Sequence, residues 1–139
     1  MSHIEELLQQ RTEAWNRHDP VALAAGYTEG AIVTSPMFPR AEGRAAIESS
    51  FAKLFRVFPE WEITLEGACI SGNRAMQLGT VRATQRGEFM GIPGSGRKVQ
   101  FECVIILDFE GDLIAHDRRI YDFTGMLMQL GVLRGKPAV

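Results

Sequence analysis

Three residues near the carboxyl end, Asp117, Arg119 and Tyr121, are spaced as partners in one functional site. They alternate along the segment "LIAHDRRIYD", so a regular strand there places all three on one face. An arginine beside an aspartate favours the ionised carboxylate and lowers its pKa. Such a pair can orient a water molecule or hold an anionic substrate group. The alternative is a salt bridge at the surface, worth about 0.5 kcal/mol.

The opposite face of the same segment carries His116 and leads to Asp122. Histidine suits acid–base catalysis near neutral pH, but the alternation predicts an exposed or interface position for His116. Asp122 stands where the strand-like segment gives way to the helix-like "FTGMLMQLG". A side-chain oxygen there can accept from the amides near Thr124 and Gly125. We therefore expect Asp122 to cap a helix, with catalysis as the alternative.

The elements that must position these residues are predicted to be helices first and strands afterwards. "SHIE" matches a capping box and begins a helix over residues 3–17, "HDPVALAAGYTEG" predicts a short second helix, and apolar spacing predicts a third that ends near residue 58. The stretch "AIVTS" between the second and third helices is strand-like. From residue 61 onward apolar and polar residues alternate, which predicts long antiparallel strands with "CVIIL" in the centre of the sheet. This order is typical of the α+β class, in a single domain over residues 1–139.

Composition excludes several classes of protein. The chain has 139 residues, a formal net charge of −2 and scattered basic residues, so a nucleic-acid-binding surface is not expected. It has no apolar run near the ~20 residues that span a membrane, and "MSHIEELLQQ" is unlike a signal peptide, so we expect a cytoplasmic protein. Cys69 and Cys103 are predicted to be buried thiols, and three dispersed histidines predict no metal site.

Two longer motifs carry a resemblance to a known family. "GEFMGIPGSGRKVQF" resembles the glycine-proline loop and following strand of the SnoaL-like polyketide cyclases and ester cyclases, and "DFTGMLMQLG" resembles their carboxy-terminal signature. These proteins belong to the nuclear-transport-factor-2-like superfamily. The resemblance implies a cone-shaped fold: about three N-terminal helices packed on a strongly curved antiparallel sheet, with a short C-terminal helix. It also implies an apolar small-molecule pocket, no cofactor, and a homodimer through the convex face of the sheet.

One position departs from the family pattern. In these cyclases the catalytic carboxylate stands three residues before the aspartate of the tail signature, where it removes a proton to start an intramolecular aldol closure. Here that position is Arg119, which cannot act as a base at neutral pH. The resemblance places Asp117, Arg119 and Tyr121 toward the pocket, so Asp117 is the carboxylate that could take over the role.

Further residues are predicted to bind the substrate. Aromatic and methionine side chains suit an apolar ligand, tyrosines can donate to a carbonyl, and a glycine-flanked loop could close over the ligand. A second carboxylate could aim at the same water molecule as Asp117. The predicted substrate-binding residues are Trp15, Tyr27, Phe55, Phe89, Met90, Glu102 and Tyr121.

Three functional hypotheses follow. The first is a cofactor-independent enzyme that transfers protons in a hydrophobic carbonyl or ester compound, with Asp117 as base and Arg119 as anion stabiliser. The second is a non-catalytic module of the same fold that binds a small molecule or serves an oligomer. The third is water addition of the kind that limonene epoxide hydrolase performs, which requires Glu102 to face the same water molecule.

Overall fold

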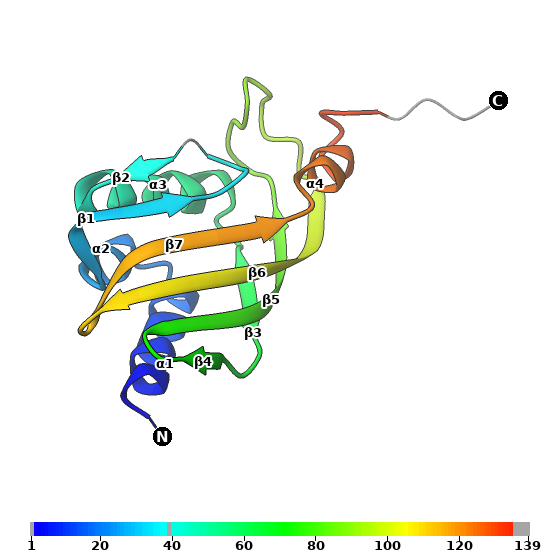
Figure 1. The fold of residues 1–139 in the computed structure, drawn as a ribbon. Coiled ribbons are helices and arrows are strands. Elements are labelled where there is room, and N and C mark those ends of the chain that lie inside the picture. Colours follow the sequence, from blue (N-terminus) through cyan, green and yellow to red (C-terminus); the bar gives the residue numbers. More distant parts are fainter. Residues whose placement is uncertain (1, 39, 135–139) are drawn as a thin grey trace.

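The computed structural model describes residues 2–38 and 40–134. Its helices are α1 (His3–Asn16), α2 (Pro20–Ala25), α3 (Arg44–Val57) and α4 (Phe123–Gln129). Its strands are β1 (Tyr27–Thr34), β2 (Ala41–Glu42), β3 (Glu62–Leu65), β4 (Cys69–Ser71), β5 (Arg74–Thr84), β6 (Lys98–Glu110) and β7 (Leu113–Tyr121). Figure 1 shows α1, α2 and α3 gathered on one side of the sheet and α4 beside the start of β6.

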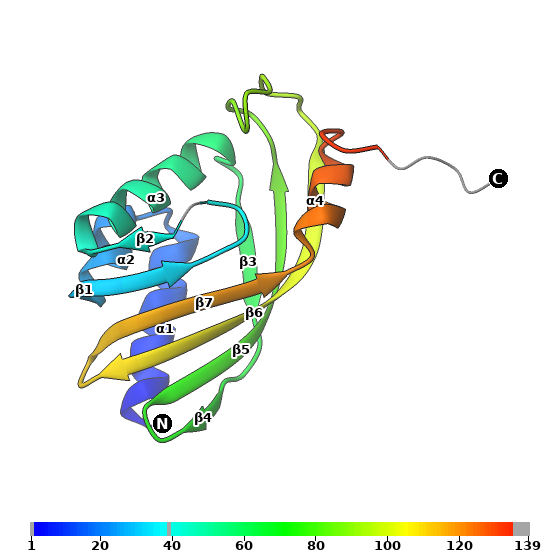
Figure 2. The same cartoon turned by 45° about the horizontal axis from the view of Figure 1, so that its top comes forward.

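The sheet is curved and mixed. Its strand order is β2-β1-β7-β6-β5-β3, with β4 also paired to β5, and Figure 2 shows it bending around α1. Most neighbouring strands are antiparallel, but β1 runs parallel to β7, with Val33 opposite Asp117. The predicted α+β class is therefore confirmed, as are the three N-terminal helices and the short C-terminal helix. The prediction of a purely antiparallel sheet is wrong, because β1 pairs with a strand that lies far along the chain.

A β-bulge near the start of β7 decides which of its side chains face inward. Phe109 pairs with Ile114 and Asp108 pairs with His116, so Ala115 is an extra residue on β7. Beyond the bulge the strand is regular. Asp117 is buried and Arg119 and Tyr121 are half-buried, whereas Arg118 and Ile120 are exposed. The predicted alternation is confirmed because the bulge precedes Asp117.

The first two helices begin at residues whose side chains cap them. The Ser2 hydroxyl accepts a hydrogen bond from the Glu5 amide at 3.2 Å, and the Asp19 carboxylate accepts one from the Ala22 amide at 3.0 Å. These caps begin α1 and α2 where the sequence predicts.

Within the described residues, each helix is too short or too polar to cross a bilayer.

The prediction of two buried thiols is correct only for Cys103. Cys103 is 5% exposed on the inner face of β6, whereas Cys69 is exposed. Cys69 lies in β4, a three-residue strand that pairs with β5 off the main path of the sheet, which leaves its side chain exposed among the described residues.

Asp122 caps α4, and its removal is expected to destabilise the protein. The Gly125 amide donates to the Asp122 carboxylate at 2.9 Å, as the sequence predicts. Asp122→Ala should lower the free energy of unfolding by about 1 kcal/mol, because one amide of the first turn loses its partner. Asp122→Asn keeps the acceptor and should lose much less. Urea unfolding of both variants measures the difference, and an unchanged alanine variant would contradict the capping role.

Candidate active site

Asp117 and three side chains that donate hydrogen bonds to it form a buried cluster. One oxygen of the Asp117 carboxylate, Oδ2, accepts from Arg11 Nη2 at 3.0 Å, from the Tyr27 hydroxyl at 2.6 Å and from Arg119 Nη2 at 2.9 Å. The other oxygen, Oδ1, accepts from Arg119 Nε at 3.3 Å. Asp117 and Tyr27 are both 0% exposed. We call Arg11, Tyr27, Asp117 and Arg119 the buried cluster; it rules out the alternative of a surface salt bridge for Asp117 and Arg119.

Electrostatics keep the carboxylate ionised. Burial alone would raise the pKa of Asp117, but the guanidinium groups of Arg119 and Arg11 and the hydrogen bonds from Arg119 and Tyr27 outweigh it and hold that pKa below its usual value. Burial raises the pKa of Tyr27 to about 12, so its hydroxyl stays protonated and donates to Asp117. With two guanidinium groups and one carboxylate, the cluster carries a net charge of +1.

Each member of the cluster comes from an element that fixes its direction. Arg11 lies on α1 between Leu7 and Trp15, four residues from each, so it occupies the helix face that packs on the sheet. Tyr27 begins β1, and the parallel pairing of β1 with β7 places it near Asp117. Sequence analysis did not identify Arg11. The signal in the sequence that could have identified Arg11 is its charge in the middle of an apolar helix face.

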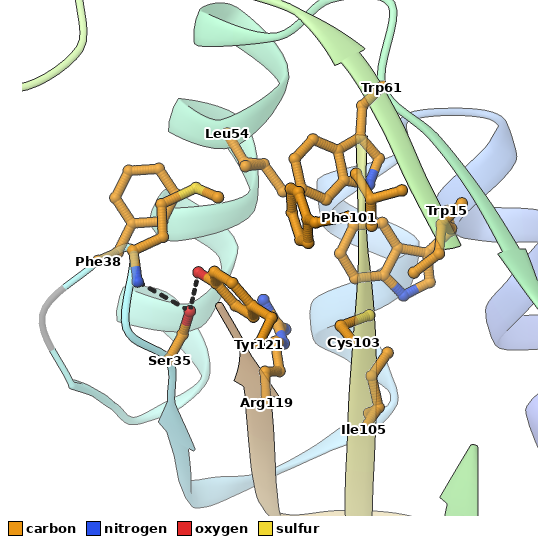
Figure 3. A pocket seen from close by; sticks show the side chains of 13 residues that line it. Trp15, Ser35, Phe38, Leu54, Trp61, Phe101, Cys103, Ile105, Arg119 and Tyr121 are labelled. Carbon is orange, nitrogen blue, oxygen red and sulfur yellow. Dashed lines mark hydrogen bonds between the residues drawn. The ribbon is translucent and has the colours of Figure 1, made fainter. Parts of the chain in front are cut away.

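A small pocket lies beside the cluster, between the inner face of the sheet and α3 (Figure 3). Its volume is about 30 Å³, room for about two water molecules. Its walls are mostly aromatic and aliphatic; they include Trp15, Phe38, Leu54, Trp61, Phe101 and Ile105. A larger ligand can therefore enter only if some of these side chains move outward.

Arg119 brings the buried cluster into contact with this pocket. Its guanidinium carbon lies 5.4 Å from the centre of the Trp15 ring and 5.1 Å from that of the Phe51 ring, which is cation–π geometry. Burial would lower the pKa of Arg119, but Asp117 raises it above its usual value, so the pocket always contains this positive charge. Asp117 itself does not line the pocket.

The other polar groups of the pocket are hydroxyl, thiol and indole groups. The Tyr121 and Ser35 hydroxyls lie 3.1 Å apart, from β7 and from the segment after β1 (Figure 3). The indole N–H groups of Trp15 and Trp61 are buried and have no hydrogen-bond partner among the described residues. Neither aspartate nor glutamate appears among the described residues that line this pocket. The pocket therefore offers hydrogen-bond donors and positive charge, but no carboxylate base.

The described part of the chain contains no candidate metal site, because no three histidine, cysteine or acidic side chains come together there. Cys103 lines the pocket, and burial raises the pKa of its thiol, which disfavours a thiolate ligand. The expectation that no cofactor is needed stays a prediction.

Four of the predicted site residues lie at the pocket or in the buried cluster. Trp15, Arg119 and Tyr121 line the pocket, and Tyr27 belongs to the buried cluster. Phe55 lies behind the pocket wall, with its ring edge-on to Trp15 at 5.9 Å. Sequence analysis did not assign Trp61, Phe101 or Ser35 to the site, because their approach depends on how β3, β6 and the segment after β1 meet in space.

The glycine-rich loop that precedes β6 does not contact the pocket. Phe89 is 3% exposed in the core and Met90 is 58% exposed, and neither lines the pocket. Phe89 and Ile92 exchange two backbone hydrogen bonds of 2.9 Å across a tight turn, and Gln85 holds the loop through the carbonyls of Gly87 and Ile92. The prediction that Phe89 and Met90 contact a ligand therefore has no support in this geometry.

Glu102 is misplaced in the sequence prediction. It is exposed and points away from the pocket, because it alternates along β6 with the inward-facing Phe101 and Cys103. Asp108, another carboxylate of β6, pairs with Arg74 at 2.7 Å on the outer face. No second carboxylate from β6 reaches Asp117, so the arrangement that the epoxide-hydrolase hypothesis requires is not formed.

The sequence profile of the SnoaL-like polyketide cyclases matches residues 5–130. The chain belongs to this family. The search of curated proteins gave no match. Among solved structures, this SnoaL-like protein is similar to TsrD from Streptomyces laurentii, at 23% identity over 96% of this chain and 99% of that one, with a TM-score of 0.82.

Two further structures show the same fold. AclR from Streptomyces galilaeus, a candidate hydroxylase, is 22% identical over 93% of this chain and 96% of its own, with a TM-score of 0.80. IdmH from Streptomyces antibioticus, a candidate polyketide cyclase, is 22% identical over 94% of this chain and 99% of its own, with a TM-score of 0.75. The family predicted from the two motifs is thus confirmed for this SnoaL-like chain, and so is the fold.

The ionised Asp117 is expected to stabilise the SnoaL-like fold in a pH-dependent way. Because its pKa is lower in the folded than in the unfolded chain, its contribution is complete above the ordinary carboxyl value of about 4 and is lost as the pH falls through the lowered pKa. Asp117→Asn should cost about 3–5 kcal/mol at pH 7, because two buried guanidinium groups lose their counter-charge.

Urea unfolding of wild type and Asp117→Asn at pH 7, 5 and 3 measures this effect. The difference between the two proteins should be equal at pH 7 and 5 and should shrink at pH 3. Asp108→Asn, in the partly exposed pair with Arg74, is the control and should cost much less. A difference that grows on acidification would contradict the cluster's charge assignment.

Proposed function

We propose that this chain is a cofactor-independent enzyme of the cyclase type, acting on an apolar small molecule that carries carbonyl groups. The observation that supports the proposal most strongly is the Arg119 guanidinium, fixed by Asp117 at 2.9 Å and facing a pocket with aromatic walls. A positive charge held in an apolar site stabilises an enolate far better than water does. The family of the chain and the similarity to IdmH support the same class of reaction.

The proposed role of Asp117 differs from the predicted one. Asp117 has three donors on one oxygen, a lowered pKa and no contact with the pocket, so it is a poor general base. We assign it a positioning role, in which it orients Arg119. Arg119 keeps the predicted role of anion stabiliser and is the proposed catalytic residue.

A substrate that is itself acidic removes the need for a carboxylate base. The carbon between two carbonyl groups loses its proton to solvent water, and the resulting enolate is stabilised by Arg119. The enolate carbon then attacks the carbon of a third carbonyl group in the same molecule, so that a carbon–carbon bond forms and the π bond of that carbonyl breaks. The oxygen of that carbonyl takes a proton back from solvent. Apolar walls would favour the folded conformation in which the two carbons approach each other.

The second candidate is a binding module that holds the same class of ligand without turnover. The observation that favours it is the lack of aspartate and glutamate among the described pocket residues, together with Arg119 at the family's carboxylate position. The two candidates predict equal affinity for an enolate and differ only in whether proton exchange at carbon is accelerated.

Arg119→Met should separate the two candidates. Benzoylacetone is a suitable probe, because exchange of its central protons in deuterated water is followed by NMR. If the protein is an enzyme, wild type accelerates exchange and the variant loses about 10²–10³-fold of that rate, the usual cost of one oxyanion donor. If it is a binding module, wild type binds the probe without acceleration.

Arg118→Met is the matched control for that experiment. Arg118 is the neighbouring residue on the same strand, but it is exposed on the outer face, so its loss should leave exchange unchanged. Thermal unfolding verifies that Arg119→Met is folded. Its cluster retains Arg11 and Tyr27 as donors to Asp117, and the charges of Arg11 and Asp117 then balance.

We also propose that two copies pair through the convex face of the sheet. Leu78, Val104 and Ile120 lie side by side on β5, β6 and β7, and Leu78 and Ile120 are 37% and 59% exposed. Met76 and Ile106 extend this row to an apolar patch on the outer face. An exposed row of this kind is typical of an interaction surface.

Ile120→Glu should convert the proposed dimer to a monomer, because it places a charge in the centre of the buried patch. Sedimentation equilibrium measures the mass of wild type and variant. Val21→Glu makes the same change at an exposed apolar residue of α2, away from the sheet, and should leave the mass unchanged. A wild-type protein that sediments as a monomer at every concentration would contradict the proposal.

A further inference from the structure

A second pocket lies among α1, α2 and the hairpin that joins β6 to β7. Its volume is about 260 Å³, and it shares no lining residue with the pocket that contains Arg119. Apolar side chains form most of its wall, among them Leu7, Leu23, Phe109 and Ile114. It is thus large enough for a small organic molecule, without the movement that the first pocket requires.

Arg11 connects this second pocket to the buried cluster. Its side chain is 7% exposed and lines the second pocket, and one of its nitrogens, Nη2, donates to Asp117. A guanidinium has five N–H donors, and the contact with Asp117 is its one hydrogen bond among the described residues. The remaining N–H donors of Arg11 have no acceptor among the described residues, and its guanidinium carbon lies 5.8 Å from the centre of the Trp15 ring and 5.2 Å from that of the Tyr27 ring. Because the side chain lines the second pocket, these donors can serve an anion bound there.

The charges around the second pocket favour an anion. Asp117 is shared by Arg11 and Arg119, so the buried cluster has a net charge of +1, and a buried charge without a counter-ion is unfavourable. Arg17 adds a second positive charge at the rim, where it is exposed and also lies 3.7 Å from the Asp19 carboxylate. The one acidic lining residue, Asp112, is exposed and is hydrogen-bonded to His3 at 2.7 Å.

We propose that the second pocket binds a small organic anion, a carboxylate with a short apolar group. Its carboxylate pairs with the free edge of Arg11 and with Arg17, and its apolar group lies against Leu23, Phe109 and Ile114. The bound anion neutralises the excess charge of the cluster through Arg11, and it does so without occupying the pocket that contains Arg119. This site is separate from the proposed reaction and can be tested without any turnover assay.

The test is a ¹⁹F NMR titration with 4-fluorophenylacetate, with the neutral 4-fluorophenylacetamide as the matched ligand. The carboxylate should bind at least about ten-fold more tightly than the amide, because only it forms charge-assisted hydrogen bonds. Arg11→Met should abolish that preference. Arg17→Gln should weaken carboxylate binding several-fold, in keeping with its position at the rim.

Two filled-pocket variants locate the binding without touching the buried cluster. Ala22→Phe fills the second pocket from α2 and should weaken carboxylate binding at least about ten-fold, whereas Ser35→Phe fills the first pocket and should leave it unchanged. Circular dichroism verifies that each variant is folded. Equal binding of carboxylate and amide, unchanged binding by Ala22→Phe, or loss of binding in Ser35→Phe would each overturn the proposal.

Discussion

The structure depends on one carboxylate that is shared by two buried arginines. Asp117 accepts from Arg11 on α1, from Tyr27 on β1 and from Arg119 within β7, so a single side chain ties the helical layer to two strands of the sheet. Without the carboxylate, two positive charges would remain in the core. The same carboxylate therefore holds α1 across the concave face of the sheet and fixes the direction of Arg119 in the pocket.

Stability alone does not account for such a cluster. Replacing a buried ion pair or triad by apolar residues of similar volume is often neutral, or stabilising by about 1–4 kcal/mol. Here the charges do not even balance, and both arginines line pockets while the aspartate does not. The two proposals account for the cluster in another way: it holds two guanidinium groups in fixed directions in apolar surroundings, so that each is ready to bind an anion.

A feature of this site can be predicted from the sequence when the pattern that reveals it lies within one helix or strand. The alternation of Asp117, Arg119 and Tyr121 could be predicted because it is a property of one strand, and the bulge at Ala115 happens to precede it. Arg11 could not be paired with Asp117, because the two residues are 106 positions apart and meet only when α1 crosses the sheet.

The two wrong predictions, a purely antiparallel sheet and Glu102 in the site, have different physical causes. The parallel pairing of β1 with β7 produces no recognisable pattern in the sequence of either strand, so the sequence could not predict a mixed sheet. Glu102, in contrast, alternates with Phe101 and Cys103, and that local pattern already indicates the outer face. The alternation of burial along β6 thus outweighs the chemical suitability of a carboxylate at position 102.

Arginine at the family's carboxylate position changes what the pocket can select. A carboxylate base acts on a neutral ketone and must itself approach the carbon that loses the proton. A fixed guanidinium instead favours whichever form of the ligand is already anionic, so affinity increases with the acidity of the ligand. Because Asp117 keeps Arg119 charged and oriented, this preference is built in before any ligand binds. Under the proposed function, the ion pair between Asp117 and Arg119 in the core thus also determines the chemical class of molecule that the pocket accepts.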